Sequence, residues 1–508
     1  MSDTVMTDSA APLRGHKVAT TVCVMLAALM QALDATIANV ALPYMQGSLS
    51  ATSEQANWVL TSYIVAAAIA TPATGVMENR FGRRKLFISC VIGFVVASML
   101  CGAAHTLDEM VMFRLLQGLF GAPLVPLAQS VLLDTYTFEQ RGSAMAIFGL
   151  GVMLGPIIGP SLGGWLTDTY SWRWVFYVNL PIGIVTAVGL FFFLAEPTRT
   201  LVMRFDVFGF AFLAIAIASL QLFLDRGQQL DWFAATEIWF EVGLFVVSMY
   251  LFLVQMFTAE YPFVERQMFA DRNFFFGQVL IFAIGAILLA TLALLTPYLE
   301  RLMNYPVLQA GLVLAPRGLG TMVSMLLVGR IIDRVGARTL IVVGLLLTAQ
   351  ALHEMSLFTP DVSESAIIRT GIVQGLGLGL VFVPLSTATF STLPPRYWTQ
   401  GTAFFNLMRN IGSSVGISVT GLLLIRYTSM MHASIAESIN PFRGPVQQLK
   451  PALTNVTARA SMDAEVSAQA AAIAYSNNFR LMMYAALLLA PLVLFLRDRP
   501  LKTMRPTG

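Results

Sequence analysis

Two ionisable residues, Asp34 and Arg114, stand inside long apolar stretches of the sequence. A charge at membrane depth is costly, so a residue of this kind is expected to be functional and to have a partner. An aspartate that moves between wet and dry surroundings can take up and release a proton, whereas an arginine keeps its charge. We therefore predict a proton-coupling site in which Asp34 carries the proton and Arg114 tunes or orients it. The alternative is a static pair that only aligns two helices.

Other polar residues inside apolar stretches are candidates for lining a substrate cavity. They are Asn39, Gln117, Arg317, Asn406, Arg409 and Asn410. Together with Arg114, Arg317 and Arg409 would make three arginines in the cavity against one acid, Asp34. This balance would favour amphipathic anions or weak acids over lipophilic cations as substrates. The alternative for Arg317 and Arg409 is structural, because they could bond to backbone carbonyls that are freed at Pro316 or at glycine kinks.

The composition of the chain places most of it in lipid. Of its 508 residues, 56% are hydrophobic and 12% are charged, which is about half the charged share of a soluble protein. The net charge of +3 gives no reason to expect nucleic acid as a partner. The three cysteines are scattered through apolar stretches, which predicts neither a disulfide framework nor a metal site. Since no ATP-binding loop is found, we expect no cofactor and an ion gradient as the energy source.

The elements that must position these residues are membrane-spanning helices of about 20 residues each. The apolar stretches give fourteen candidates: 18–44, 57–77, 86–104, 109–132, 143–164, 173–194, 207–224, 237–257, 274–298, 307–328, 339–358, 367–390, 400–425 and 477–496. Most of the 31 Lys and Arg residues then fall in loops on one side, which predicts that both termini are cytoplasmic. The fold class is therefore an all-α membrane protein.

The loop "GVMENRFGRR" after the second span is repeated as "GRIIDRVGAR" after the tenth, and "VPLAQS" (125–130) is matched by "VPLSTA" (383–388). The residues of this loop motif are Gly75, Glu78, Asn79, Arg80, Gly82 and Arg84 in the first copy, and Gly329, Asp333, Arg334, Gly336 and Arg338 in the second. A duplicated unit predicts two six-helix halves around a central site. The predicted parts are a tail at 1–17, a first half at 18–194, two inserted helices at 207–257, a second half at 274–496 with a long external loop at 426–476, and a tail at 497–508.

Glycine recurs every fourth residue in the fifth span, and two prolines lie among these glycines. The segment comprises Gly151, Gly155, Pro156, Gly159, Gly163 and Gly164. One helix face is then bare backbone, which permits very close packing, and the prolines are expected to bend the helix. The stretch "GPSLG" (159–163) also matches the nucleophile pattern of hydrolases. We expect no enzyme, because none of the four histidines falls in this span to act as a base.

Four motifs in this order resemble those of the major facilitator superfamily, specifically its fourteen-helix drug:proton antiporters of the EmrB/QacA type. They are "LDATIANVALP" (33–43), the loop at 75–84, "RLLQGLFGA" (114–122) and "GVMLGPIIGPSLGG" (151–164). The resemblance covers essentially the whole chain and implies the major facilitator fold and proton-coupled multidrug efflux by alternating access. In that family the fifth-helix glycine segment seals the interface of the two halves. The loop's acid and arginines help lock the outward-open state. In this chain Asn79 occupies the position where the family usually has an acid. Either Glu78 takes the place of that acid, or the outward-open state is locked less firmly.

The resemblance also implies a bacterial inner-membrane location, with drugs or weak amphipathic acids, protons and membrane lipid as ligands. It further implies a periplasmic adaptor of the EmrA-like membrane fusion type and an outer-membrane channel. The loop at 426–476 would offer the adaptor a docking surface, or it would only cap the helices. One rival function is an uptake symporter, which the fifth-span motif and the two inserted helices argue against. The other is a transport-inactive sensor or scaffold, which the retention of Asp34 and Arg114 argues against.

Overall fold

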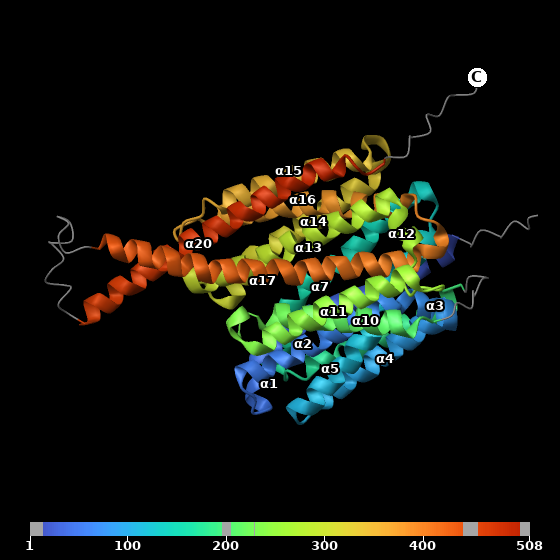
Figure 1. Cartoon of the computed structure of the whole chain (residues 1–508), viewed down its shortest axis with the longest axis horizontal. Coiled ribbons are helices and arrows are strands. Elements are labelled where there is room, and N and C mark those ends of the chain that lie inside the picture. Colours follow the sequence, from blue (N-terminus) through green and yellow to red (C-terminus); the bar gives the residue numbers. More distant parts are fainter. Residues whose placement is uncertain (1–13, 196–204, 228, 440–455, 498–508) are drawn as a thin grey trace, which may run out of the picture.

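The computed structural model describes residues 14–195, 205–227, 229–439 and 456–497. Within these residues the chain is helical, with turns and short connections and no strand. Most of the predicted tails at 1–17 and 497–508, and the middle of the predicted loop at 426–476, lie outside the described residues. The helices lie side by side in one elongated bundle (Figure 1).

The first half contains nine helical segments: α1 (Arg14–Ser48), α2 (Ser53–Ala70), α3 (Thr74–Phe81), α4 (Arg83–Ala103), α5 (Leu107–Gly121), α6 (Leu124–Thr135), α7 (Arg141–Thr169), α8 (Trp174–Tyr177) and α9 (Asn179–Phe193). Three predicted spans are interrupted: a short 3₁₀ turn at Thr71–Ala73 separates α2 from α3, and brief breaks separate α5 from α6 and α8 from α9. Thr52 and Thr106 start α2 and α5 with capping boxes, which satisfy the free amides of the first turn.

The inserted helices are α10 (Val207–Arg226) and α11 (Thr236–Thr258). The second half contains α12 (Arg266–Ala270), α13 (Arg272–Pro297), α14 (Val307–Val335), α15 (Ala337–Met355), α16 (Glu364–Ser391), α17 (Trp398–Ser438) and α20 (Val456–Val493). Within the halves, α1 packs against α7 and α13 packs against α17, which is the same pairing of first and fifth helices.

A helix lies at each of the fourteen predicted spans. Among the described residues, twelve segments are long and apolar enough to cross a membrane by length and composition. The other two predicted spans, 339–358 and 477–496, correspond to α15 and the end of α20. These helices are not among the twelve, but they pack in the bundle against each other, and α15 also packs against α16.

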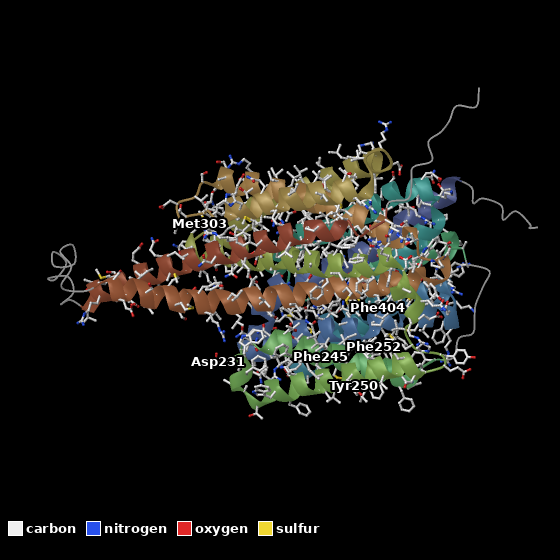
Figure 2. All side chains as sticks on the ribbon, turned by 45° about the horizontal axis from the view of Figure 1, so that its top comes forward. Asp231, Phe245, Tyr250, Phe252, Met303 and Phe404 are labelled. Carbon is white, nitrogen blue, oxygen red and sulfur yellow. The ribbon has the colours of Figure 1, made fainter. Side chains whose placement is uncertain are left out.

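The two inserted helices lie on one side of the bundle, where α10 separates α11 from the halves. α10 packs against α2 of the first half and α17 of the second, while α11 packs mainly against α10. One face of α11 is therefore uncovered by protein: Tyr250 is exposed, whereas Phe252 is buried against the bundle (Figure 2). Apolar side chains on such a face suit contact with lipid.

The predicted long loop at 426–476 is largely helical in the described residues. α17 continues to Ser438, and α20 already begins at Val456, so both helices run beyond the bundle (Figure 1). His432 on α17 lies 3.0 Å from Asp463 on α20, which joins the two extensions. The α20 extension is helical because residues 461–475 are rich in alanine, which has the highest helix propensity. We call this feature the α17/α20 projection. It lies at the opposite end of the bundle from α3 and the loop motif.

Candidate functional site

Asp34 lies at the centre of a closed polar cluster in the first half. Its side chain is fully buried, and its two oxygens accept three hydrogen bonds from neighbouring helices. The donors are Arg114 Nη1 at 2.8 Å, Gln117 Nε2 at 2.8 Å and Asn179 Nδ2 at 3.1 Å. The ion pair that the sequence predicted between Asp34 and Arg114 is therefore direct, and it joins α1 to α5.

Arg114 is 1% exposed, so its guanidinium depends on protein partners for all its stabilisation. Besides Asp34, it donates from Nη1 to Gln117 Oε1 at 2.8 Å and from Nε to the Val59 carbonyl at 3.2 Å. The ring of Tyr63 lies 4.9 Å from the guanidinium carbon, and the ring of Phe176 lies 5.1 Å from it. Paired charges and aromatic faces together offset the loss of water around a buried cation.

Asn179 and Ser98 complete the cluster, and the sequence analysis did not identify either. Asn179 Nδ2 also donates to Ser98 Oγ at 2.9 Å, and Ser98 Oγ donates to the Phe176 carbonyl at 2.9 Å. Both residues are fully buried. Asn179 is a polar residue inside an apolar stretch, which is the same signal that pointed to Asn39, so the sequence did contain a sign of it.

The glycine segment of α7 holds the backbone of α1 next to Asp34. A Cβ placed on Gly155 would come within 2.6 Å of the Ala32 carbonyl carbon, and Thr36 Oγ1 donates to the Gly155 carbonyl at 3.2 Å. Gly151 and Gly163 likewise face Met25 and Ile37 of α1. In this conformation these glycines pack against α1 within the first half, so their role as a seal between the halves stays a prediction. The close approach follows from the missing side chains.

α7 meets the second half through other residues. Gly149 and Gly142 of α7 lie against Met325 and Ile332 of α14, and Gly318 of α14 lies against Ile157 of α7.

The predicted cavity residues are not gathered in one place. Gln117 is part of the Asp34 cluster, whereas Asn39 and Asn410 are exposed. Asn406 is buried and donates to Gln129 Oε1 at 3.0 Å, which links α17 of the second half to α6 of the first. Asn406 therefore serves as a contact between the halves in this conformation.

Arg317 on α14 and Arg409 on α17 both lie near α13, and neither forms an ion pair within the described residues. Arg317 is 6% exposed and donates from Nη2 to the Leu288 carbonyl of α13 at 3.1 Å, which is not a carbonyl freed at Pro316, and its Nη1 has no partner. Arg409 is half-buried and reaches the Asn410 side chain at 3.4 Å.

The first copy of the loop motif forms a chain of ion pairs in which Glu78 is the motif's acidic residue. Glu78 is buried and lies 2.5 Å from Arg83, and Arg83 lies 2.9 Å from Asp134 on α6. Of the predicted arginines, Arg80 lies beside the Phe81 ring, and Arg84 donates to the Phe191 carbonyl on α9. The geometry thus favours Glu78 as the substitute for the usual acid.

The two copies of the loop motif share a backbone conformation. Gly82 and Gly336 have φ of 83° and 85°, and they are the two glycines with positive φ among the described residues. Each ends one helix and starts the next, which requires a conformation that glycine adopts readily. In the second copy, Asp333 and Arg334 are exposed.

Each copy of the motif contacts the opposite half. A Cβ on Gly75 would lie 2.9 Å from Gln400 Cβ on α17, and Ser143 Oγ on α7 donates to the Gly329 carbonyl at 2.7 Å. The two halves therefore touch at the end of the bundle that carries the loop motif.

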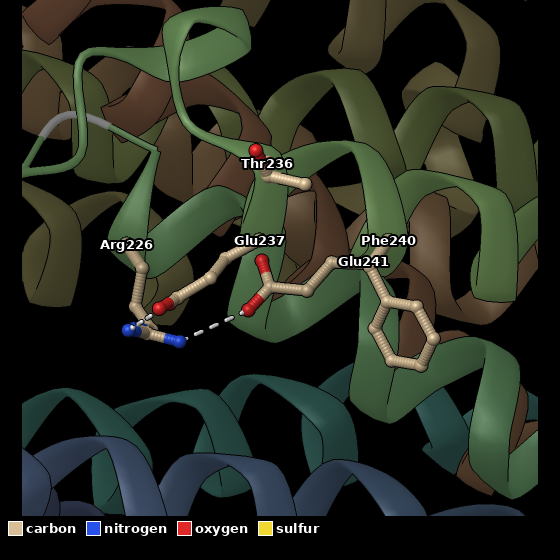
Figure 3. A pocket seen from close by; sticks show the side chains of 5 residues that line it. All are labelled: Arg226, Thr236, Glu237, Phe240 and Glu241. Carbon is tan, nitrogen blue, oxygen red and sulfur yellow. Dashed lines mark hydrogen bonds and ion pairs between the residues drawn. The ribbon is translucent and has the colours of Figure 1, made fainter.

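A small pocket of about 350 Å³ lies between the inserted helices, and none of its lining residues belongs to the Asp34 cluster. It surrounds Arg226, which forms ion pairs with Glu237 at 2.7 Å and Glu241 at 3.2 Å (Figure 3). Both acids pair with the same arginine, while the second carboxylate oxygen of Glu241 is buried without a hydrogen-bond partner in the described structure. Among the described residues, no group of three or more His, Cys, Asp and Glu side chains could hold a metal ion.

Comparison with known proteins agrees with this geometry. Residues 24–417 match the family model of the Major Facilitator Superfamily. The chain is 36% identical to the multidrug export protein EmrB of Escherichia coli (strain K12) over 441 residues, which is 86% of each chain. It is also 36% identical to the fatty acid resistance protein FarB of Neisseria gonorrhoeae over 440 residues, 86% of this chain and 87% of that protein.

Solved structures confirm the fold at low sequence identity. The human organic anion transporter MFSD10 matches with a TM-score of 0.61 at 14% identity, covering 94% of this chain and 99% of that one. A double-tryptophan mutant of XylE matches with a TM-score of 0.62 at 12% identity, covering 96% and 97%. The family model and the two relatives span most of the chain, so this protein belongs to the major facilitator superfamily and, within it, to the EmrB-like multidrug export proteins.

Proposed function

We propose that this protein exports amphipathic small molecules from the cytoplasm in exchange for protons, by alternating access between its two halves. The observation that carries the proposal is the buried carboxylate of Asp34, whose hydrogen bonds join α1, α5 and α9. Relatives that are named as multidrug and fatty acid resistance proteins support export as the direction of transport.

The chemistry of Asp34 explains how a proton could drive the cycle. In the described conformation the carboxylate accepts hydrogen bonds from Arg114, Gln117 and Asn179, all of which suit its ionised form. A proton on Asp34 would remove the charge attraction to Arg114 and convert one acceptor oxygen into a donor. The contact between α1 and α5 would then weaken, and these helices could rearrange. Arg114 stays charged throughout, so it pairs with the Asp34 carboxylate again once the proton leaves.

The proposal includes a location and partners. The chain lies in the bacterial inner membrane with both termini in the cytoplasm, needs no cofactor, and takes its energy from the proton gradient. The α17/α20 projection then faces the periplasm, where it offers an EmrA-like adaptor, and through it an outer-membrane channel, a docking surface. Deleting residues 440–470 should reduce cross-linking to such an adaptor while insertion is unchanged; undiminished cross-linking would refute docking here.

The central test is Asp34→Asn in everted membrane vesicles. We expect the variant to insert normally but to lose drug-driven proton movement, because the amide cannot bind a proton while it still accepts and donates hydrogen bonds in the cluster. Asp231→Asn, the same change at an exposed aspartate between the inserted helices, is the matched control and should leave exchange intact. Normal proton/drug exchange by Asp34→Asn would refute the coupling role.

A further inference from the structure

The second half contains a counterpart of the Asp34 cluster that lacks the acid. Gln117 donates to Asp34 across 83 positions of sequence, and Gln374 Nε2 donates to Thr291 Oγ1 across the same 83 positions, at 3.2 Å. Thr291 lies on α13 and Gln374 on α16, the helices that correspond to α1 and to α5 in the duplicated unit. A hydroxyl therefore stands in the second half where the first half has a carboxylate.

The cation of this second cluster comes from a different helix. By the same spacing, the counterpart of Arg114 is Gly371, which carries no side chain. Arg317 on α14 occupies the space instead: its Cβ lies 3.6 Å from the position of a Cβ on Gly371. The carbonyl of Arg317 also lies against Gly375, so two glycines of α16 make room for this arginine.

Arg317 has no negative partner in the described part of the chain. Its Nη2 is bonded to the Leu288 carbonyl, but Nη1 is buried without a hydrogen-bond acceptor, and Gln374 Oε1 is also buried and unpartnered. An uncompensated charge in a dry environment costs several kcal/mol, and a native protein keeps one where something offsets it. In the first half, the aspartate provides that compensation to Arg114.

The position of Arg317 connects it with the route between the halves. The next residue, Gly318, packs against Ile157 of α7 in the first half. α14 therefore presents its 317–318 turn at the boundary along which an alternating-access transporter must open. A ligand that enters between the halves would meet this turn first, and the Arg317 side chain extends from it towards Leu288 of α13.

From these observations we infer that Arg317, assisted by Gln374 and Thr291, binds the carboxylate of an amphipathic substrate. A carboxylate supplies the acceptor that Nη1 lacks, and arginine matches carboxylates with paired N–H donors. The Thr291 hydroxyl already donates to the Ile287 carbonyl at 2.7 Å and holds the Gln374 amide in place, so the further donor for the carboxylate is the second N–H of Gln374. The surrounding apolar side chains suit a hydrocarbon tail. This inference rests on the proposed function and assigns the organic anions among its substrates a binding site of their own.

A binding experiment on the full-length protein in phosphatidylcholine nanodiscs tests the site directly. Dodecanoate and dodecyltrimethylammonium have the same tail and opposite charges. We expect Arg317→Gln to weaken dodecanoate binding by about tenfold or more and to leave the cation unchanged. Arg317→Lys, which keeps the charge but loses the paired donors, should bind dodecanoate less tightly than the wild type and more tightly than Arg317→Gln. Arg301→Gln, which removes an exposed arginine, should keep the full affinity. Equal weakening of both ligands, or of neither, would overturn the inference.

A transport experiment separates this inference from the proposed function. In proteoliposomes with a proton gradient, wild-type protein should move both amphiphiles, whereas Arg317→Gln should move only the cation. If the wild type moves neither, the proposed function fails. If the wild type moves dodecanoate and Arg317→Gln moves it equally well, only the inference fails.

A gain-of-acid variant gives an independent test. Thr291→Asp places a carboxylate where the duplicated unit has Asp34, so it should pair with Arg317, raise the thermal unfolding temperature and abolish stabilisation by dodecanoate. Undiminished stabilisation by dodecanoate in this variant would count against the site.

A lipid head group is the other possible ligand of Arg317. Repeating the wild-type and Arg317→Gln titrations in phosphatidylglycerol nanodiscs distinguishes it from a carboxylate substrate. The substrate assignment would be overturned if Arg317→Gln lost phosphatidylglycerol that the wild type retains but bound dodecanoate as well as the wild type does.

Discussion

Ser130 and Thr399 share a hydrogen bond of 2.6 Å between their hydroxyl oxygens, although 269 positions of sequence separate them. Ser130 lies on α6 of the first half and Thr399 at the start of α17 in the second. Arg83, which pairs with Glu78, also reaches Ser130 at 3.5 Å. The loop motif is thereby connected to the contact that closes its end of the bundle. An alternating-access cycle requires this contact to break and re-form.

A disulfide across this contact should stop transport. In the double variant Ser130→Cys, Thr399→Cys, mild oxidant should form a cross-link, because the two hydroxyls already touch. Export should then fall to background and recover after reduction. The three native cysteines are buried, so they should not interfere. The single-cysteine variants are the controls; a cross-linked protein that still exports would show that these halves need not separate here.

Glu78→Gln should impair export more than Asp333→Asn. The first substitution breaks a nearly buried pair with Arg83, at a cost of about 3 kcal/mol, whereas Asp333 is exposed. We expect a several-fold lower export rate in vesicles for Glu78→Gln at matched protein levels. A stronger effect of Asp333→Asn would mean that the second copy of the motif carries the functional acid.

Gly155→Leu should destabilise the first half and abolish export. A side chain at this position meets the backbone of Ala32 and Leu33, so α7 would be pushed away from the turn of α1 that carries Asp34. The expected cost is about 1–3 kcal/mol from overpacking, or more where backbone cannot yield. Thermal unfolding in detergent measures it. Gly243→Leu on α11 is the matched control, since nothing lies within 4 Å of its added Cβ.

The inserted helix α10 should be energetically coupled to the second half. Gln221 Nε2 donates to Ser414 Oγ on α17 at 2.9 Å, and Ser418 donates to the Leu224 carbonyl at 2.7 Å. A double-mutant cycle with Gln221→Leu and Ser414→Ala should give a coupling free energy of about 1 kcal/mol in thermal or denaturant unfolding. Additive effects would show that α10 is held by apolar packing alone.

Much of the fold follows from local sequence properties. The fourteen apolar stretches coincide with helices because a backbone in lipid must satisfy its hydrogen bonds within the segment. The duplicated loops have the same glycine conformation, at Gly82 and Gly336, because the same residue pattern repeats the same turn. The pairing of Asp34 with Arg114 was also foreseeable, since two opposite charges at similar depth have few other ways to lower their energy in an apolar core.

Partners across the fold depend on how the helices are arranged. The glycines at 151–163 predict a close contact, but only the packing shows that they contact α1, whereas Gly142 and Gly149 of the same helix contact the second half. Likewise Asn406 and Gln117 carry the same polar signal in sequence, yet one bridges the two halves and the other belongs to the Asp34 cluster. The sequence thus specifies which residues must find polar or close-packed partners, because burial cost is a local property. Which partners they find is decided by the rotation and register of whole helices against one another, which arise from the summed packing of the bundle.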